Sequence, residues 1–385
     1  MEEIEWIKFP HDLQVKFFIN AEKETKRVID SIIKLQEKMH TIKNDIVKNL
    51  EPLEENDKVF KVASIDGSRS PRLSERLGIR YGVFTASIIV LEGKKNIHED
   101  FEAGQFKRKQ AFSQEVSKYF FDMLSTYAER KIALENLDKA DFLILDGSFY
   151  GFIYTARIIN REGLLGESEK EILNKLIEMT NKLIDSKKVF SVIKRSHTRV
   201  IEGLLYLKNR NYVPDKIIDK LILSYIMPAR TIFRYEKLIG EEDVGVYTRV
   251  AYYAERKKEE NLLEYAKRMG EEPFKELEIK DHRKNLLKRM QVKAFNDTTV
   301  CEIEHPSIPI EKMKEWIGQK NFFNEATGLP IALDIVDSLT RFTPKFTEEY
   351  VTEIESRLLE YAEKGDISKE AIKWFFSLLN PQKPY

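Results

Sequence analysis

Two apolar segments far apart in this chain run into the same acidic tripeptide, and this repeat limits the possible folds more than any other feature. The segment "VASIDGS" reaches Asp66-Gly67-Ser68, and "FLILDGS" reaches Asp146-Gly147-Ser148, 80 positions later (146 − 66). Short runs of β-branched and other apolar residues are typical of strands buried inside a sheet. Neighbouring parallel strands lie only about 5 Å apart. If these two strands are neighbours, Asp66 and Asp146 end at one edge of the sheet and share one small volume.

The order of the remaining elements predicts an α/β fold. A second β-rich segment follows at 80–93, and a third strand core follows at 189–196. Helical patterns lie between the strands at 113–137 and 167–188. Strands separated by helices of about 20 residues favour parallel neighbours, and the 80–93 segment, which has no helix before it, adds an antiparallel strand. We therefore expect a mixed β-sheet flanked by helices.

The flanking segments suggest three regions: an N-terminal helical arm at 1–57, a main domain at 58–345 and a C-terminal helical extension at 346–385. Within the main domain, residues 200–330 are highly charged, and we interpret them as an insertion or lid of unassigned topology. The arm has an apolar seam at helical spacing, which would pack either on its own domain or on another subunit. The residues of this seam are Val28, Ile32, Leu35, Met39, Ile42 and Ile46.

Composition excludes several classes of protein. The 64 lysines and arginines balance 64 acidic residues, so net charge neither favours nor excludes nucleic acid. Cys301 is the single cysteine, which excludes an internal disulfide and a cysteine-rich zinc site. No apolar run approaches the ~20 residues of a membrane span. The acidic start "MEEIEWIKF" lacks the pattern of a signal peptide, so we expect a cytoplasmic protein without a membrane partner.

Two carboxylates at adjacent strand ends would repel each other unless they share a cation. Hard divalent ions such as Mg²⁺ and Mn²⁺ prefer such oxygen ligands. Asp-Gly-Ser is also an ordinary turn sequence, and the pattern alone does not decide between a turn and a metal site. Glu129 in the 113–137 helix, with Glu135 as its rival, and Asp337 in a helix after Gly328 are further candidate ligands. Asp337 stands beside Asp334, and a solvated helix residue is the more common role for acids at such positions.

Four carboxylates from two strands and two helices would hold two metal ions. In such a site one ion activates a water and the other stabilises the leaving oxygen of a displacement at phosphorus. Lys194, which follows the third strand core, would face the same site and steady the phosphate or the attacking water.

These segments, in this order, resemble the NurA nucleases. The resemblance rests on "ASIDGSRS", the helix with Glu129, "FLILDGSF", "FSVIKRS" and "GLPIALDIVDSLTR", and covers roughly residues 58–343. It implies an RNase H-like fold, in which Asp66, Asp146 and Glu129 match the metal-binding acids and Lys194 matches a lysine of the family. It also implies manganese-dependent 5′-to-3′ exonuclease and single-strand endonuclease activity in DNA end resection and repair, a homodimer, and a HerA-like hexameric ATPase as partner. The sequence contains no phosphate-binding loop of its own for ATP.

One departure from the family pattern leaves alternatives open. NurA proteins often carry Ala-His where this chain has Val336-Asp337, so the fourth ligand is in question, although an aspartate suits Mg²⁺ or Mn²⁺. A non-catalytic subunit that only binds DNA or the ATPase therefore stands as an alternative. A phosphatase of the haloacid dehalogenase type is disfavoured, because Ser64 and Ile144 occupy the positions that its nucleophilic aspartate requires.

Overall fold

A computed structural model describes residues 9–108, 114–254, 256, 261–365 and 367–379. Its centre is one mixed sheet with the strand order β1-β8-β9-β10-β7-β6-β2-β4-β3, and β5 pairs with β4. The strands are β1 (Leu50–Pro52), β2 (Lys61–Arg69), β3 (Ser74–Glu75), β4 (Arg80–Glu92), β5 (Lys95–Arg108), β6 (Phe142–Asp146), β7 (Val189–Ile193), β8 (Thr231–Arg234), β9 (Lys288–Lys293) and β10 (Cys301–His305).

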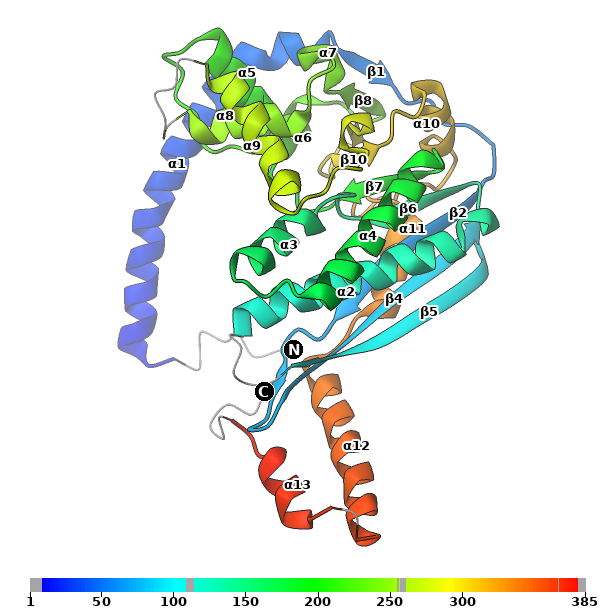
Figure 1. Ribbon diagram of the computed structural model, residues 1–385. Coiled ribbons are helices and arrows are strands. Elements are labelled where there is room, and N and C mark those ends of the chain that lie inside the picture. Colours follow the sequence, from blue (N-terminus) through cyan, green and yellow to red (C-terminus); the bar gives the residue numbers. More distant parts are fainter. Residues whose placement is uncertain (1–8, 109–113, 255, 257–260, 366, 380–385) are drawn as a thin grey trace.

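Helices cover the sheet on both faces (Figure 1). They are α1 (His11–Val47), α2 (Gln114–Glu135), α3 (Phe152–Arg161), α4 (Glu167–Asp185), α5 (Val200–Lys208), α6 (Asp219–Ile226), α7 (Glu236–Ile239), α8 (Val244–Tyr253), α9 (Leu262–Glu276), α10 (Ile310–Ile317), α11 (Ile331–Thr340), α12 (Pro344–Glu363) and α13 (Lys369–Phe375). Short 3₁₀ turns lie at Leu137–Lys139 and Lys284–Leu286.

The parallel core of the sheet confirms the expected α/β fold. β2 pairs in parallel with β6, and β6 pairs in parallel with β7, while β4 lies antiparallel to β2. One apolar face, which includes Ile65 and Leu145, packs against α2, α3 and α4. The opposite face, which includes Val62 and Ile144, packs against α10 and α11. Alternate residues of each strand thus enter different cores, as the period-2 geometry of a strand requires.

The segment 200–330 extends the central sheet, although we expected an insertion or lid. Its strands β8, β9 and β10 join the sheet, and β10 lies antiparallel to β7. One face of β10 carries two buried acids, Glu302 and Glu304. Arg289 on β9 forms ion pairs with both acids, at 3.1 Å and 2.8 Å respectively, which compensates their burial. The boundaries of the three expected regions stay a prediction.

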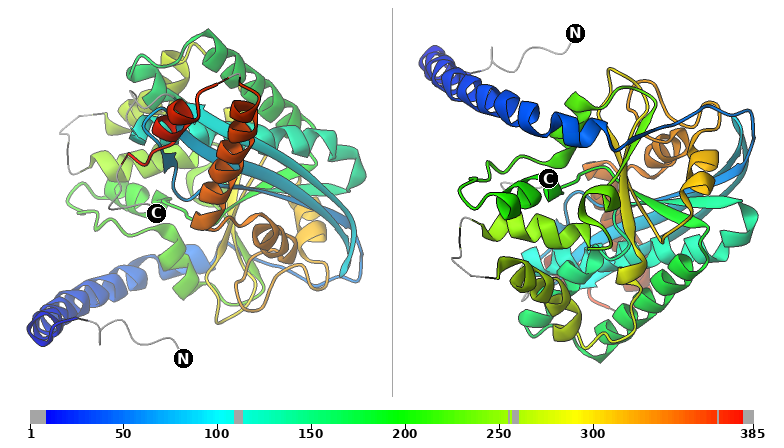
Figure 2. Two further views of the ribbon diagram at one scale, coloured as in Figure 1. Left: turned by 90° about the horizontal axis from the view of Figure 1, so that it is seen from below. Right: turned by 90° about the horizontal axis from the view of Figure 1, so that it is seen from above.

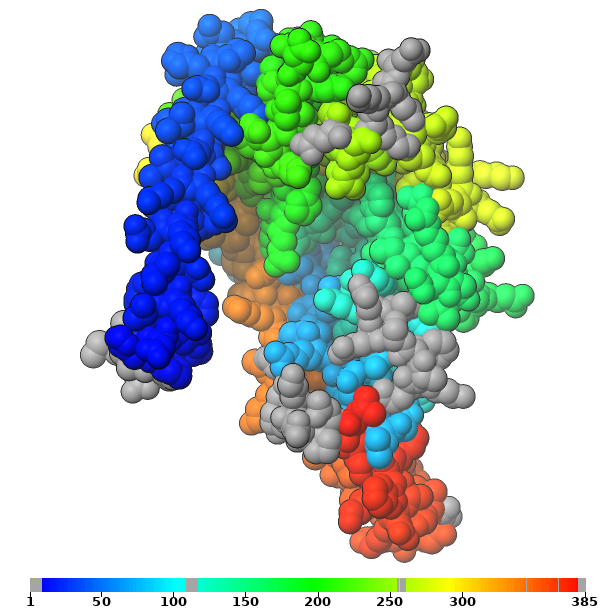
Figure 3. Space-filling model, turned by 90° about the vertical axis from the view of Figure 1, so that its left-hand side faces the viewer, coloured from blue at the N-terminus to red at the C-terminus, as the bar shows by residue number. Residues whose placement is uncertain are grey.

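The arm helix α1 is buried only at its C-terminal end. Met39, Ile42 and Ile46 pack into a core with α5 and α6, whereas Val28 and Ile32 are exposed. The N-terminal half of α1 therefore stands away from the body of the molecule, as Figures 2 and 3 show. The expected apolar seam thus divides into a packed part and a free part.

The C-terminal residues form two helices, as expected. In α12 and α13, Val351 and Ile372 pack with Tyr81 of β4 at the far end of the sheet. The helix break was expected at Gly365-Asp366, and of these two residues Asp366 lies outside the described part of the chain. None of the described helices is both long and apolar enough to span a membrane.

Candidate active site

Asp66 and Asp146 lie at the same height on neighbouring parallel strands. Ile65 pairs with Leu145 in the β2–β6 ladder, an offset of 80 residues (145 − 65). The two aspartates have the same offset (146 − 66), so they stand side by side at the next position along the ladder. Because successive side chains alternate between faces, both carboxylates project on the same side of the sheet. The 80-residue repeat in the sequence is thus the register of the two strands.

The two Asp-Gly-Ser tripeptides differ in conformation, although both were expected to end their strands. β2 continues through Gly67 to Arg69, whereas β6 ends at Asp146. Gly147 has a φ of +77°, a left-handed conformation that favours glycine. At Gly67 the requirement is space, because a Cβ atom there would overlap the carboxylate of Glu129. The two glycines are therefore needed for different reasons.

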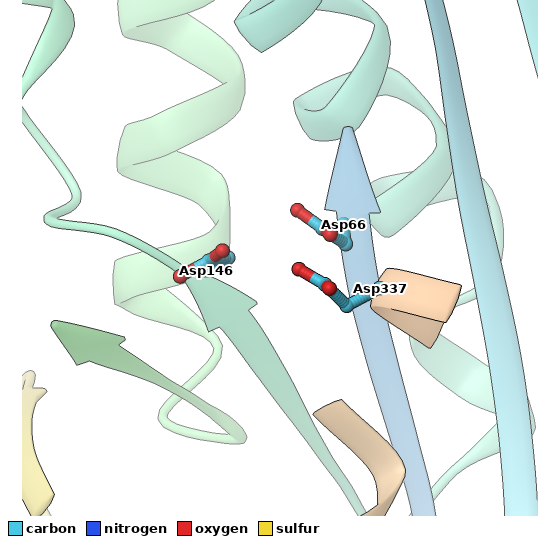
Figure 4. Close-up of side chains that lie close together, drawn as sticks. All are labelled: Asp66, Asp146 and Asp337. Carbon is cyan, nitrogen blue, oxygen red and sulfur yellow. The ribbon is translucent and has the colours of Figure 1, made fainter. Parts of the chain in front are cut away.

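Asp337 of α11 joins the two strand aspartates (Figure 4). One carboxylate oxygen from each of Asp66, Asp146 and Asp337 lies within 4.8 Å of the other two. An octahedral ion with bonds of about 2.1 Å holds opposite ligand oxygens about 4.2 Å apart, so the spacing suits Mg²⁺ or Mn²⁺. The oxygen-only donor set also fits these hard ions.

Glu129 borders the same site from α2. Its carboxylate lies against Gly67, and it lines a cleft of about 940 Å³ together with the three aspartates. It is not a member of the group within 4.8 Å. The four predicted acids therefore enter one cleft, with three of them clustered and Glu129 beside them.

Crowding of the acids perturbs their protonation in the metal-free protein. Burial raises the pKa of Asp66 to about 8, and repulsion from Asp146 and Glu129 adds to the effect. Burial likewise raises the pKa of Glu129 to about 7, partly opposed by the positive charge of Arg130. A divalent cation bound between the carboxylates would offset the repulsion among them and so favour their ionised forms.

Lys194 already supplies positive charge to the cluster. Its Nζ lies 3.1 Å from Asp146 Oδ2 and donates a hydrogen bond of 2.9 Å to Asp337 Oδ1. Burial alone would lower the pKa of Lys194, but Asp146, Asp337 and Asp66 raise it above its usual value. The hydrogen bond from Lys194 in turn holds the pKa of Asp337 below its ordinary value. Lys194 is therefore charged and touches two of the candidate ligands.

A family model of the NurA domain matches residues 60–342. The chain belongs to the NurA family. The crystal structure of the NurA nuclease from Sulfolobus solfataricus matches with a TM-score of 0.57 at 15% identity, covering 90% of this chain and 97% of that chain. This likeness confirms the fold.

Two further solved structures are similar at TM-scores below 0.5 and add nothing to the fold assignment. A crystal structure of NurA has a TM-score of 0.47 at 13% identity, covering 87% of this chain and 96% of that chain. A crystal structure of NurA bound to dAMP and manganese has a TM-score of 0.46 at 12% identity, covering 84% of this chain and 93% of that chain. A comparison with curated protein sequences gives no significant match.

Within this NurA-family site, the packing of helices distinguishes the candidate acids from their neighbours in the sequence. Glu135, the rival of Glu129 on the same helix, is exposed and does not line the cleft. Asp334, one turn before Asp337, accepts hydrogen bonds of 2.7 Å from Asn324 and Thr327 and stabilises their loop. All five predicted site residues line one cleft, but their catalytic roles stay a prediction.

The sequence did not point to two residues that support the site. Arg130 is 1% exposed and lies between Glu129 and the Ser148 carbonyl, with Nη1–Oε2 and Nη2–O distances of 3.7 Å and 3.5 Å. Glu304 of β10 accepts hydrogen bonds of 2.8 Å from the Ser148 hydroxyl and the Phe149 amide, which hold the turn after Asp146. The adjacency of Arg130 to Glu129 was the only available signal, since Glu304 lies 158 residues beyond Asp146 (304 − 146).

Proposed function

We propose that this chain is a metal-dependent deoxyribonuclease that hydrolyses phosphodiester bonds. Membership of the NurA family supports a nuclease. The observation that carries the proposal is the convergence of Asp66, Asp146 and Asp337 within one open cleft, with Glu129 beside them. Such a cluster destabilises a protein unless a cation binds to it, so its presence favours a metal site over a plain turn.

The proposed mechanism assigns one task to each part of the cleft. Asp66, Asp146, Glu129 and Asp337 would hold two Mn²⁺ or Mg²⁺ ions. When bound, these ions activate water and neutralise the charge that develops at phosphorus. Asp66 would bridge the two ions, and Asp146, Glu129 and Asp337 would complete their ligation. The reaction adds water across one phosphorus–oxygen bond, leaving a phosphate monoester and a free hydroxyl.

Basic residues of the cleft would position the DNA strand. Arg195 and Arg341 line the cleft together with Lys194. Positive side chains at this place attract the phosphate backbone without reading sequence. Lys194 would exchange its contacts with Asp146 and Asp337 for the phosphate or the attacking water when metal is bound. It would then act as a catalytic residue beside the ligands.

The finer activity follows from the family and stays a proposal. We propose 5′-to-3′ exonuclease and single-strand endonuclease action, in DNA end resection and repair, by a cytoplasmic homodimer that works with a HerA-like ATPase. Exposed apolar side chains on two helices support contacts with other chains. The N-terminal half of α1 exposes Val28, Ile29, Ile32 and Ile33, and α13 exposes 62% of Trp374. We assign these helices to dimer or ATPase contacts.

The central test uses single-stranded DNA labelled at either end and incubated with Mn²⁺, with Mg²⁺ or with a chelator. We expect cleavage only in the presence of metal, and the label that is released first gives the direction of attack. DNA that is retained without cleavage under every condition would contradict the proposal and favour the non-catalytic subunit.

A second test concerns the ATPase contact. Removing residues 346–385 also removes packing against Tyr81, so the milder variant Trp374→Ala should accompany the truncation. We expect both variants to lose association with the ATPase in co-sedimentation, with cleavage of single-stranded DNA retained by Trp374→Ala. Unchanged association of both variants would exclude the C-terminal helices as the contact.

A further inference from the structure

A second cavity, of about 380 Å³, opens beside the metal cleft. Four residues line both the cavity and the cleft, so the two spaces share a wall. These residues are Ser148, Gly151, Ile193 and Arg195. Ligand pockets in proteins typically measure about 300–1,000 Å³, which places this cavity at the size of a small ligand. A strand held in the cleft would therefore pass its mouth.

The cavity is closed by the segment that was expected to be an insertion. One side is formed by α3 and the chain after β7, and the other by α7, α8, α9 and the start of β9. Its lining is mainly apolar and aromatic, with Tyr150, Ile153, Ile239, Val244, Phe274 and Leu287 among the residues. A planar, weakly polar ligand suits this lining better than an ionic one.

Two cations of the cavity lining are already neutralised by acids. Lys284 lies 3.1 Å from Asp243 Oδ2 and 3.0 Å from Glu271 Oε1. Arg289 forms ion pairs with Glu302 and Glu304. A phosphate would have to compete with these carboxylates at Lys284 and Arg289, so the part of the cavity around them is a poor phosphate site. The uncharged base and sugar of a nucleotide meet no such competition.

Tyr154 of α3 provides an aromatic surface among the residues that line the cavity. Its side chain is 52% exposed, and its hydroxyl accepts a hydrogen bond of 2.6 Å from Arg249 Nη2, which restricts the position of the ring. A nucleobase could stack on this exposed ring.

We propose that this cavity receives one unstacked nucleoside of the DNA strand whose phosphodiester lies at the carboxylate cluster. The inference rests on the proposed nuclease function and adds to it a contact with the base. Stacking on one aromatic ring holds any of the four bases, so the cavity would position the strand without strict sequence preference. A released mononucleotide has the same chemistry and is the other source of this ligand.

The first experiment removes the base and leaves the protein unchanged. Single-stranded oligonucleotides with one abasic residue at successive positions are cleaved with Mn²⁺, and the rate at each phosphodiester is compared with that of the intact strand. We expect a loss of about tenfold at a fixed distance from the abasic residue, the scale of one lost base–aromatic stack. If the rate at every phosphodiester equals that of the intact strand, the cavity assignment is wrong, while the nuclease function still holds.

The second experiment changes the ring. Tyr154→Ala should cut the intact strand about tenfold more slowly and lose the abasic effect, whereas Tyr154→Phe should keep both, because it retains the stacking surface. Tyr225→Ala is the matched control, since Tyr225 is also an exposed tyrosine (67%) but does not line the cavity. If Tyr154→Ala and Tyr225→Ala behave alike, the assignment is wrong.

Binding measurements distinguish the cavity proposal from the nuclease proposal. They also distinguish the two sources of the nucleoside, the DNA strand and the released mononucleotide. Anisotropy titrations with Ca²⁺ in place of Mn²⁺ compare the intact strand, the strands with one abasic residue and a deoxynucleoside monophosphate. A Tyr154-dependent preference for the intact strand without any cleavage would support the cavity and contradict the nuclease proposal. Tyr154-dependent binding of the mononucleotide alone would place released product in the cavity and overturn the claim about the strand.

Discussion

Replacing Asp66 by asparagine should have two opposite effects, loss of activity and gain of stability. Asp66 is 8% exposed, and its burial, together with the like charges of Asp146 and Glu129, raises its pKa from 3.8 to about 8 in the metal-free protein. The folded protein therefore binds more protons than the unfolded chain between these two values. Its free energy of unfolding falls as the pH rises through this window.

The size of the stability effect follows from the same pKa. One pKa unit corresponds to about 1.36 kcal/mol, so full ionisation of Asp66 costs at most about 6 kcal/mol. The sharing of protons across the coupled acids reduces this cost, and we expect about 2 kcal/mol at pH 8. The asparagine side chain carries no charge at any pH, so the metal-free Asp66→Asn variant should melt about 2–3 °C higher than the wild type.

The assay combines thermal melting at pH 5 and pH 8, with a chelator and with Mn²⁺, and cleavage of single-stranded DNA. We expect the variant to lose cleavage by at least about 100-fold, because the proposed bridging ligand is gone. Asp138→Asn, at an exposed aspartate outside the cleft, is the matched control. Cleavage within twofold of the wild type, or a lower melting temperature without metal at pH 8, would refute the reasoning.

Two further predictions concern the turn after Asp146 and a buried histidine. Gly147→Ala should cost about 1 kcal/mol of stability, because Gly147 has a φ of +77°, whereas Gly151→Ala should be neutral, since its φ is −55° and the new Cβ meets only ordinary contacts. Urea unfolding measures both, and equal effects would contradict the strain argument. Burial, with the charges of Arg234 and Lys288, lowers the pKa of His305 from 6.5 to about 4, so the unfolded chain binds more protons between these values and stability falls as the pH drops through them. We expect a loss of about 3 kcal/mol between pH 7 and pH 4 that His305→Asn removes, as urea titrations at each pH would show, and an unchanged acid profile in that variant would argue against it.

The alternation of apolar strands and helices was sufficient to predict the core of the fold. β2, β6 and β7 are short and apolar, so they were recognisable as central strands. β9 and β10 were not, because the buried acids Glu302 and Glu304 are neutralised by Arg289 only after the two strands pair. The sequence shows the charged residues of this segment but does not show that the two strands pair with each other. For this reason the segment 200–330 was interpreted as an insertion or lid.

For the site, the sequence by itself determined that Asp66 and Asp146 each follow an apolar strand core, whereas the structure showed that the two strands are neighbours in register. Only the tertiary structure decided which helical acids join them. Glu129 and Glu135, or Asp334 and Asp337, are equivalent as sequence, and the packing of α2 and α11 on the sheet turns one member of each pair into the cleft. An apolar strand that ends at an acid is a local pattern and can be read from the sequence, whereas the pairing of strands and the orientation of helices depend on side chains from distant parts of the chain.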